Sequence, residues 1–301
     1  MNDYLEGIAD LGSLAETKTL IFKYKKYQLV HIDCSPNDML RNPGDKEWYL
    51  VARGIPEKYG DIEYSNPSIL ISIINLAMKI DENNGLKDEL AFSDEVSEWC
   101  HKYGHPFEEL SLREDYYVGT DGNPRLIKEY TGQIEELPKS RCHGFRVREF
   151  KRRILVLYDH FQLWHGLTFD DFKKVIKFSH FNFDFNKDLD EQIIKLKGYL
   201  ARRVYNQANA RIGLQYNEKN DSYTIIPITR DLISVAYFQL AMLMTNKGLK
   251  GVKFCSMCNK LFEINHGGTK ICDDCKPEYH KIKTQESRMK NGTKKEKELK
   301  H

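Results

Sequence analysis

The sequence contains no long hydrophobic run. No apolar stretch approaches the roughly 18 residues that a membrane-spanning helix needs. The chain starts with MNDYLEGIADLG, which has neither the basic start nor the apolar segment of a secretory signal peptide. We therefore expect a cytoplasmic protein that has no membrane partner.

Short motifs of several enzyme classes are also absent. The chain has no Gly-rich phosphate loop, no G-x-S-x-G and no H-E-x-x-H, and no order of Ser, His and Asp indicates a catalytic triad. One pair remains, Arg153 and His160, in which the histidine would act as acid or base in a helical ribonuclease or toxin of a phage-defence system. A chain with 46 basic residues and 10 histidines produces this spacing by chance. A helix-surface pair is therefore the preferred interpretation, and the sequence favours a role other than catalysis.

Cysteine is scarce outside one short segment. The three scattered cysteines are Cys34, Cys100 and Cys142. Their irregular spacing fits a reducing compartment better than a secreted disulfide framework.

The other four cysteines form two C-x-x-C pairs separated by thirteen residues, namely Cys255, Cys258, Cys272 and Cys275. Two tight turns that each present two thiolates predict a tetrahedral Zn²⁺ site. Because four thiolates leave no coordination position open, we expect a structural zinc ion. The alternatives are unrelated free cysteines or a redox pair, but a redox C-x-x-C is normally single and lies near a βαβ unit.

Charge is distributed unevenly along the chain, although the net charge is only +2. From Asn246 to His301 there are 14 Lys and Arg against 7 Asp and Glu, whereas the rest of the chain has 32 against 37. A basic end beside a zinc module is typical of nucleic-acid binding. The alternative is a solvated tail that keeps the protein soluble.

Two basic segments are candidate contacts for nucleic acid. After the last cysteine, a short helix from about Glu278 to Met289 is predicted, on or near which lie Lys276, Lys281, Lys283 and Arg288. A long amphipathic helix is predicted from Arg141 to Trp164, and its basic first half offers Arg148 and Arg152. A solvated helix face that pairs with acidic neighbours is the alternative for both arginines.

The pattern of elements predicts an α+β fold that is predominantly helical. It combines a small N-terminal β region, a helical body with a β-hairpin and a C-terminal zinc-knuckle module. An irregular connection around 110–140 is the predicted boundary between the first two parts. The predicted divisions are an N-terminal α+β region at 1–110, a helical body at 141–248 with the hairpin at 212–226, a zinc-binding module at 251–290 and a disordered basic tail at 291–301.

The last third of the chain resembles a known bacterial family. In order it contains VYNQANARIG, the apolar helix DLISVAYFQLAMLMTNKGLKG and the knuckle CSMCNKLF. This order resembles proteins with an ABATE domain followed by a CGNR-type zinc finger, described as stress-induced transcription regulators. The resemblance covers roughly 66–290 and assigns the metal to the same four cysteines. The Cys-Gly-Asn-Arg signature is absent, since Lys276-Pro277-Glu278 follows the last cysteine, so no DNA-reading role transfers to a single residue.

Together these features predict a nucleic-acid-binding zinc protein, namely a bacterial transcription regulator or a stress- or defence-associated factor. DNA is favoured over RNA as its partner, and a homodimer stays open. The alternatives are the helical ribonuclease and a zinc-stabilised module that clamps a partner protein.

Overall fold

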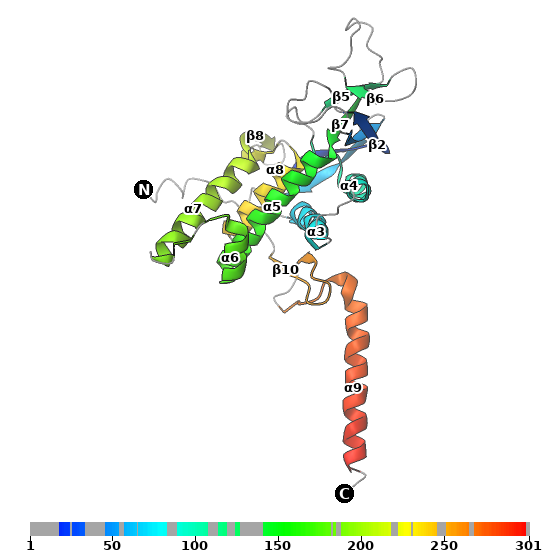
Figure 1. Cartoon of the computed structure of the whole chain (residues 1–301), viewed down its shortest axis with the longest axis vertical. Helices are drawn as coiled ribbons and strands as arrows, with labels where there is room; N and C mark the ends of the chain where they lie inside the picture. Colours follow the sequence, from blue (N-terminus) through cyan, green and yellow to red (C-terminus); the bar gives the residue numbers. More distant parts are fainter. Residues whose placement is uncertain are drawn as a thin grey trace, which may run out of the picture. The chain divides into compact units, whose positions relative to one another are not determined.

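The computed structural model divides the chain into two compact units, Met1–Leu249 and Lys250–His301. The residues it describes are 18–24, 26–33, 46–53, 57–64, 66–82, 89–107, 114–118, 124–126, 141–181, 183–184, 188–217, 222–229, 231–245, 251–264 and 268–298. The fold is α+β and predominantly helical with small antiparallel sheets, which confirms the predicted class (Figure 1).

The largest sheet of the first unit has five antiparallel strands. Its order is β2 (Lys26–Asp33), β3 (Lys46–Arg53), β7 (Arg141–Arg146), β5 (Glu114–Val118) and β6 (Pro124–Leu126). The middle of β3 is buried from Tyr49 to Ala52, so this strand belongs to the core. The sheet therefore combines strands from both sides of the connection around 110–140.

One prediction about this region is wrong. Arg141–Arg146 form strand β7 instead of the first turns of a helix. The division into regions 1–110 and 141–248 stays a prediction. In the register of β7 on β3, Phe145 lies opposite Leu50 and Gly144 opposite Val51. Phe145 and Leu50 are both buried, and glycine is a weak helix former. Pairing with a distant strand therefore outweighs the local helical pattern, which carries no information about that partner.

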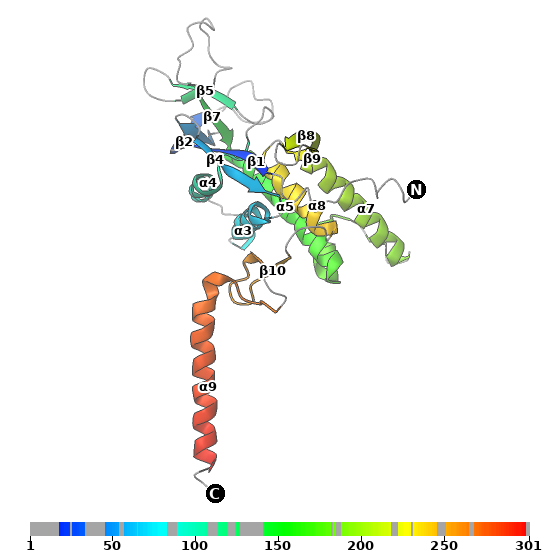
Figure 2. The same cartoon turned by 180° about the vertical axis from the view of Figure 1, so that it is seen from behind.

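Two smaller antiparallel sheets are also found among the described residues of this unit. Strand β1 (Lys18–Lys23) pairs with β4 (Glu57–Glu63), with an irregularity between Leu20 and Ile21 (Figure 2). Strand β8 (Arg211–Asn217) pairs with β9 (Ser222–Ile228). The second pair confirms the hairpin predicted at 212–226.

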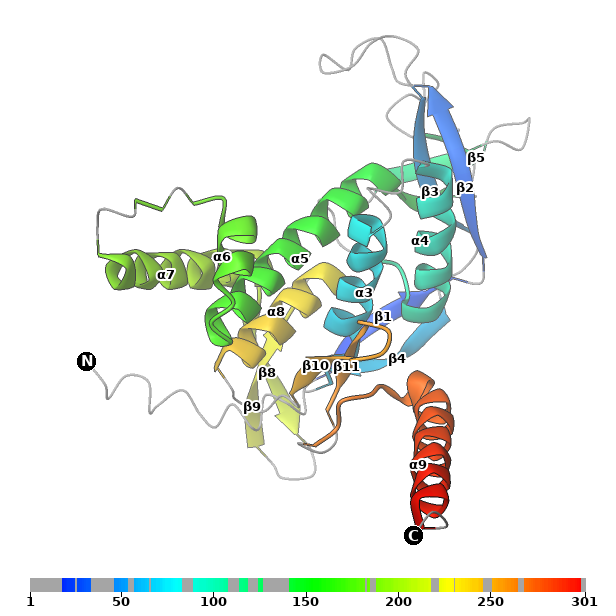
Figure 3. The same cartoon turned by 60° about the horizontal axis from the view of Figure 1, so that its bottom comes forward.

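The described helices of the first unit pack around a buried centre. They are α3 (Ser68–Glu82), α4 (Glu89–Tyr103), α5 (Val147–Thr168), α6 (Phe172–Ser179), α7 (Leu189–Ala208) and α8 (Leu232–Thr245). Helices α3, α5 and α8 lie side by side, and α7 packs on α8 (Figure 3). Almost the whole surface of α8 is buried. Among the helices that the structure describes, α8 included, none combines the length and apolar character needed to cross a membrane.

A buried glutamine connects α8 to the start of α3. The amide of Leu70 donates a hydrogen bond to Oε1 of Gln239 at 2.9 Å, and Nε2 of Gln239 donates to the carbonyl oxygen of Asn66. The first amides of a helix have no partner within the helix, so Gln239 supplies one of them from a neighbouring helix. This fixes the register of α8 against α3.

A tight corner joins α5 to α6. A Cβ atom on Gly166 would lie 3.1 Å from the carbonyl oxygen of Asp171 and 3.1 Å from Cγ2 of Val175, so only glycine fits there without displacement. The side chain of Asp171 caps α6 by accepting a hydrogen bond from the amide of Lys174 at 3.3 Å. His180 ends α6 with a left-handed φ of 49°.

The second unit is small and is built around the paired cysteines. It contains β10 (Val252–Phe254), β11 (Leu261–Glu263), the short 3-10 helix η3 (Asp273–Cys275) and α9 (Lys276–Glu298). The sequence predicts disorder at 291–301, whereas α9 continues to Glu298 and residues 299–301 lie outside the described part. Lys and Glu, which dominate this segment, are strong helix formers. The high charge of this segment favours disorder, but the helix propensity of its Lys and Glu residues favours the observed helix.

Candidate metal centre and basic helix

The first cysteine pair lies in the turn between β10 and β11. The amide of Cys255 donates to the carbonyl oxygen of Lys260 at 2.8 Å, and the amide of Asn259 donates to the carbonyl oxygen of Cys255 at 2.9 Å. Asn259 has a left-handed φ of 59°, a conformation that asparagine adopts more readily than most residues. These bonds close the loop so that Cys255 and Cys258 project from one turn.

The second cysteine pair brackets η3. Cys272 precedes this short helix and Cys275 is its last residue. The carbonyl oxygen of Cys272 accepts hydrogen bonds from the amides of Cys275 at 3.1 Å and Lys276 at 3.2 Å. Because α9 starts at Lys276, the second pair is part of the structure that begins this helix.

The fold brings all four predicted ligands together. The amide of Cys272 donates to Sγ of Cys255 at 3.4 Å, and the amide of Ser256 donates to the carbonyl oxygen of Lys270 at 3.1 Å. The four Sγ atoms all lie within 4.8 Å of one another. Sγ of Cys258 and Sγ of Cys272 are 3.7 Å apart, close to the separation of about 3.8 Å expected for two ligands of a tetrahedral metal with bonds of about 2.3 Å. This cluster is able to hold a metal ion.

The electrostatics of the cluster favour a bound cation. Burial raises the pKa of Cys255, but the amides of Cys272, Cys258 and Met257 donate to its sulfur and together lower the pKa to about 6. Hydrogen bonding to the neighbouring sulfurs of Cys258 and Cys272 raises the pKa of Cys275. One thiolate is thus stabilised by the backbone, whereas further ionisation is opposed by the adjacent sulfurs. A cation among the four sulfurs removes that opposition.

A very small apolar core surrounds the cysteines. Its buried members are Cys255, Ile271 and Cys272, and the side chains of Phe262 and Tyr279 pack against them. Two of the three buried residues are therefore candidate metal ligands. Tyr279 lies in the first turn of α9, so the packing around the sulfurs also orients this helix.

Helix α9 carries the first group of predicted nucleic-acid contacts on an exposed surface. Lys276, Lys281, Lys283 and Arg288 are all exposed. Lys276 forms an ion pair with Asp273, and Nζ of Lys283 lies 3.0 Å from Glu286. Among the residues that the structure describes, Lys281 and Arg288 have no such partner. The helix contains eight Lys and Arg against four Glu.

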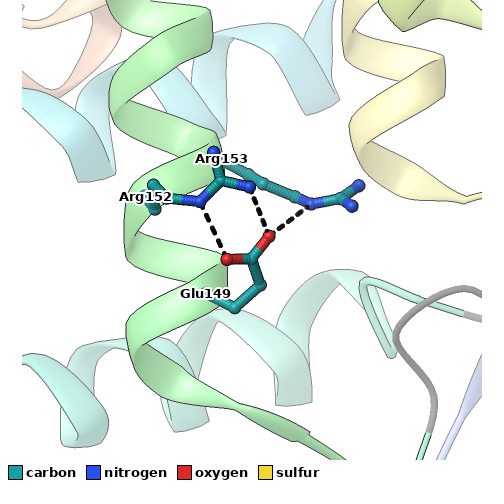
Figure 4. A network of polar contacts seen from close by, with 3 residues as sticks. All are labelled: Glu149, Arg152 and Arg153. Atoms are coloured by element: carbon teal, nitrogen blue, oxygen red, sulfur yellow. Dashed lines mark hydrogen bonds and ion pairs between the residues drawn. The ribbon is translucent and has the colours of Figure 1, made fainter. Parts of the chain in front are cut away.

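Arg148 and Arg152, the other two predicted contacts, lie on α5 in the first unit. Both are exposed. Arg152 makes two hydrogen bonds to Glu149, from Nε at 2.8 Å and from Nη2 at 2.6 Å (Figure 4). The hydrogen bond from Arg152 lowers the pKa of Glu149, and the hydrogen bond from Arg153 lowers it further. Arg152 therefore has an acidic partner within its own helix, as the solvated-face alternative expects.

The structure also gives the environment of the Arg153 and His160 pair. Arg153 donates to Oε1 of Glu149 at 3.1 Å, and its guanidinium lies 5.5 Å from the ring centre of Phe107. Nδ1 of His160 lies 3.2 Å from the hydroxyl of Tyr237. Each side chain therefore has its own partners in the first unit.

Two residues that the sequence analysis did not single out, Tyr199 and Arg203, line a cavity of the first unit together with His160. They are four residues apart on α7 and so lie on one face of the helix. That spacing is visible in the sequence, but the contribution of α5 to the same cavity is not.

No family model matches this chain, and neither a curated protein nor a solved structure matches it. Functional inference therefore depends on the chemistry of the sites themselves.

Proposed function

We propose that the second unit is a structural zinc module that binds nucleic acid through α9, with DNA favoured over RNA. One observation carries this proposal: the four-cysteine cluster is continuous with a helix whose side chains from His280 to Met289 are exposed. A metal-stabilised base that presents an exposed, predominantly basic helix has the chemistry that a polyanion requires.

Zinc is the metal that this donor set favours. Four thiolates in a tetrahedron are typical of Zn²⁺ or of iron–sulfur centres. The separation of 3.7 Å between Sγ of Cys258 and Sγ of Cys272 suits two ligands of a single ion. With four protein ligands the ion has no open position, so it supplies folding free energy and takes no part in a reaction.

Four of the eight basic side chains of α9 form two rows along the helix. Lys276 and Lys283 are seven residues apart, as are Lys281 and Arg288, and seven residues are two turns or about 10.5 Å along the axis. The two lysines of the first row form ion pairs with Asp273 and Glu286. The row of Lys281 and Arg288 is not neutralised by carboxylates among the described residues, so we assign the main phosphate contacts to it.

The resemblance to proteins with an ABATE domain and a CGNR-type zinc finger supports the same role. We extend the proposal to a bacterial transcription regulator or stress-associated factor that acts in the cytoplasm, where reducing conditions keep thiols available for metal. The sequence departs from that family directly after Cys275, where Lys276-Pro277-Glu278 replaces the expected signature. The proposal therefore concerns backbone contacts and assigns no base-reading residue.

Fluorescence anisotropy with labelled DNA and RNA duplexes of one sequence tests this function. The zinc-loaded chain should bind DNA at low salt, with an affinity that falls steeply as salt rises. The double variant Lys281→Ala/Arg288→Ala should reduce the slope of log K against log salt by about 1.8, since each phosphate contact contributes about 0.9. The matched control Lys276→Ala/Lys283→Ala removes the same charge from the other row and should change the slope less.

Three results would each contradict a part of the proposal. Absence of binding to both duplexes at low salt rejects a nucleic-acid partner. Equal losses in the two double variants reject the assignment of the contacts to one row. Tighter binding to the RNA duplex would reverse the preference for DNA.

A second candidate function is protein binding, because α9 also exposes an apolar row. Ile282 is 40% exposed and Met289 is 72% exposed, and they are seven residues apart. Such a row suits a partner helix, including a second copy of this chain. Ile282→Ser/Met289→Ser would then lower the mass found by light scattering, or release a copurified polypeptide, without changing DNA affinity.

A further inference from the structure

A cavity of about 600 Å³ lies in the first unit between α5, the end of α6 and α7. Its volume is in the range of about 300–1,000 Å³ that is typical of small-molecule sites. Helix α5 contributes Arg152 and His160, and α7 contributes Tyr199 and Arg203. His180, which ends α6, also lines it. The cavity is therefore lined from three helices. The tight corner at Gly166 helps to fix α6 against α5.

Positive side chains outnumber negative ones in the lining. Arg152, Lys195 and Arg203 line the cavity with a single carboxylate, that of Asp159. Nε2 of His180 lies 3.8 Å from Oδ2 of Asp159, so this carboxylate has a nearby histidine. The balance of charge favours an anionic ligand.

Arg203 differs from the other two cations of the lining. Lys195 pairs with Glu191 at 2.6 Å, and Arg152 is bound by Glu149. Arg203 has no carboxylate partner among the residues that the structure describes. Its Nε donates to the hydroxyl of Tyr199 at 2.9 Å, and its guanidinium lies 5.1 Å from the centre of that ring. Tyr199 thus orients the guanidinium while the Nη groups keep donors for a phosphate.

The pKa of His160 reflects the positive charge around the cavity. Burial lowers its pKa most, and the positive charges of Arg203 and His180 lower it further, to about 4. The ring is therefore neutral at pH 7, and Nδ1 lies 3.2 Å from the hydroxyl of Tyr237. When Tyr237 donates to Nδ1, Nε2 carries the proton and becomes a donor. The charge of Arg203, which disfavours the imidazolium form of His160, also attracts an anion.

Aromatic rings complete the lining on the α6 and α7 sides. Tyr199 is 45% exposed and Phe181 is 38% exposed, and Phe178 also lines the cavity. Exposed rings beside a cationic site provide stacking surfaces for a base.

We propose that this cavity binds a nucleoside phosphate, with the phosphate on Arg203 and the base on Tyr199 or Phe181. The site lies within the first unit and takes a small molecule, so it goes beyond the binding of nucleic acid by α9. Each proposal can fail without the other, because they use different residues and different ligands.

Isothermal titration calorimetry on the full zinc-loaded chain tests the site with AMP, GMP, CMP and UMP as probes. Inorganic phosphate and adenosine separate the two halves of the ligand. At least one mononucleotide should bind more tightly than either. Arg203→Ala should weaken both the mononucleotide and phosphate by about 10–100-fold, the range for hydrogen bonds to a charged group. Tyr199→Ala should weaken the mononucleotide more than phosphate.

Arg202→Ala is the matched control, because Arg202 is exposed on α7 but does not line the cavity. It should bind the mononucleotide as the wild type does. Circular dichroism melting of each variant verifies that the first unit stays folded. Absence of binding by all four mononucleotides at millimolar concentration overturns the proposal, and so does an equal loss in Arg202→Ala. Equal affinity for phosphate and the mononucleotides overturns the base contact and with it the nucleoside assignment.

Discussion

The two units of this chain are stabilised in different ways. In the first unit, ten residues of α8 are buried, and the rings of Phe107, Phe145 and Phe150 pack with centres 5.4 to 6.0 Å apart. In the second unit, the buried cluster consists of Cys255, Ile271 and Cys272. Apolar burial is sufficient to stabilise the first, whereas the second has too little apolar core for its size.

This difference implies that the two units respond to different perturbations. Metal removal should act on the second unit, and truncation of apolar side chains should act on the first. Experiments that perturb one unit at a time test this separation, and metal removal should have the largest effect.

Removing the metal should unfold the second unit and leave the first intact. Structural zinc contributes about 10–16 kcal/mol of apparent free energy in small zinc modules. We expect about one zinc ion per chain by elemental analysis, and we expect EDTA or Cys255→Ser/Cys258→Ser to expose 251–298 to limited proteolysis. Thermal unfolding of the first unit should be unchanged.

The matched control uses a cysteine of the first unit. Cys100 is buried in α4, so Cys100→Ala should lower the melting temperature of the first unit without changing the zinc content. Zinc would have no role in stabilising the second unit if the chain contained no zinc. The same conclusion would follow if the second unit resisted protease equally with and without EDTA.

Truncation in the aromatic cluster should have the converse effect. Phe145→Ala removes a fully buried ring from β7, where it packs on Phe107 and Phe150. The expected cost is about 3–5 kcal/mol, measured by urea unfolding of the first unit. Zinc content and resistance of the second unit to protease should not change. Loss of zinc in Phe145→Ala would show that the two units are energetically coupled.

The segment around Phe145 also illustrates what the sequence can and cannot predict. The four cysteines are identified by spacing alone, because the turn that presents two thiolates is local. The hairpin at 212–226 and the buried helix α8 are likewise encoded by local patterns. Strand β7 is not, since its conformation depends on pairing with β3, about ninety residues earlier in the sequence. The cavity cannot be predicted from the sequence for the same reason. His160 on α5 and Arg203 on α7 line one cavity only because these two helices pack near each other.

Stability of the first unit should depend on His160 below neutral pH. The pKa of this group is lowered from 6.5 to about 4 by burial, Arg203 of α7 and His180 after α6, while Tyr237 of α8 contacts the neutral ring. Asp159, its neighbour on α5, is the adjacent carboxylate. Between pH 6.5 and about 4 the unfolded chain binds the proton more tightly. The free energy of unfolding should therefore fall as pH falls through this window.

The variant His160→Gln isolates this contribution. Glutamine cannot ionise, so the pH dependence of urea unfolding should become shallower than in the wild type by on the order of 1–3 kcal/mol across the window. His165 on the same helix also has a pKa lowered to about 4, mainly by burial, so some dependence should persist. Parallel pH profiles for the wild type and His160→Gln would contradict the lowered pKa.

The smallest expected effect concerns the charges of α5. Glu149→Gln weakens the contacts that hold Arg152 and Arg153 in Figure 4. Because the side chain of Arg152 is 64% exposed, the free energy of unfolding should change by less than about 1 kcal/mol. If α9 makes the nucleic-acid contacts, releasing Arg152 should also leave the salt slope of DNA binding unchanged.

Glu95→Gln is the control for this change, since it breaks another exposed ion pair of the first unit, that with Lys79. Both variants raise the net charge equally, so a general electrostatic effect on DNA binding would appear in both. A steeper salt slope in Glu149→Gln alone would mean that freed Arg152 reaches a phosphate. Nucleic-acid contact would then belong to the first unit as well, and the contrast between a metal-stabilised binding module and an apolar body would no longer describe how the chain binds.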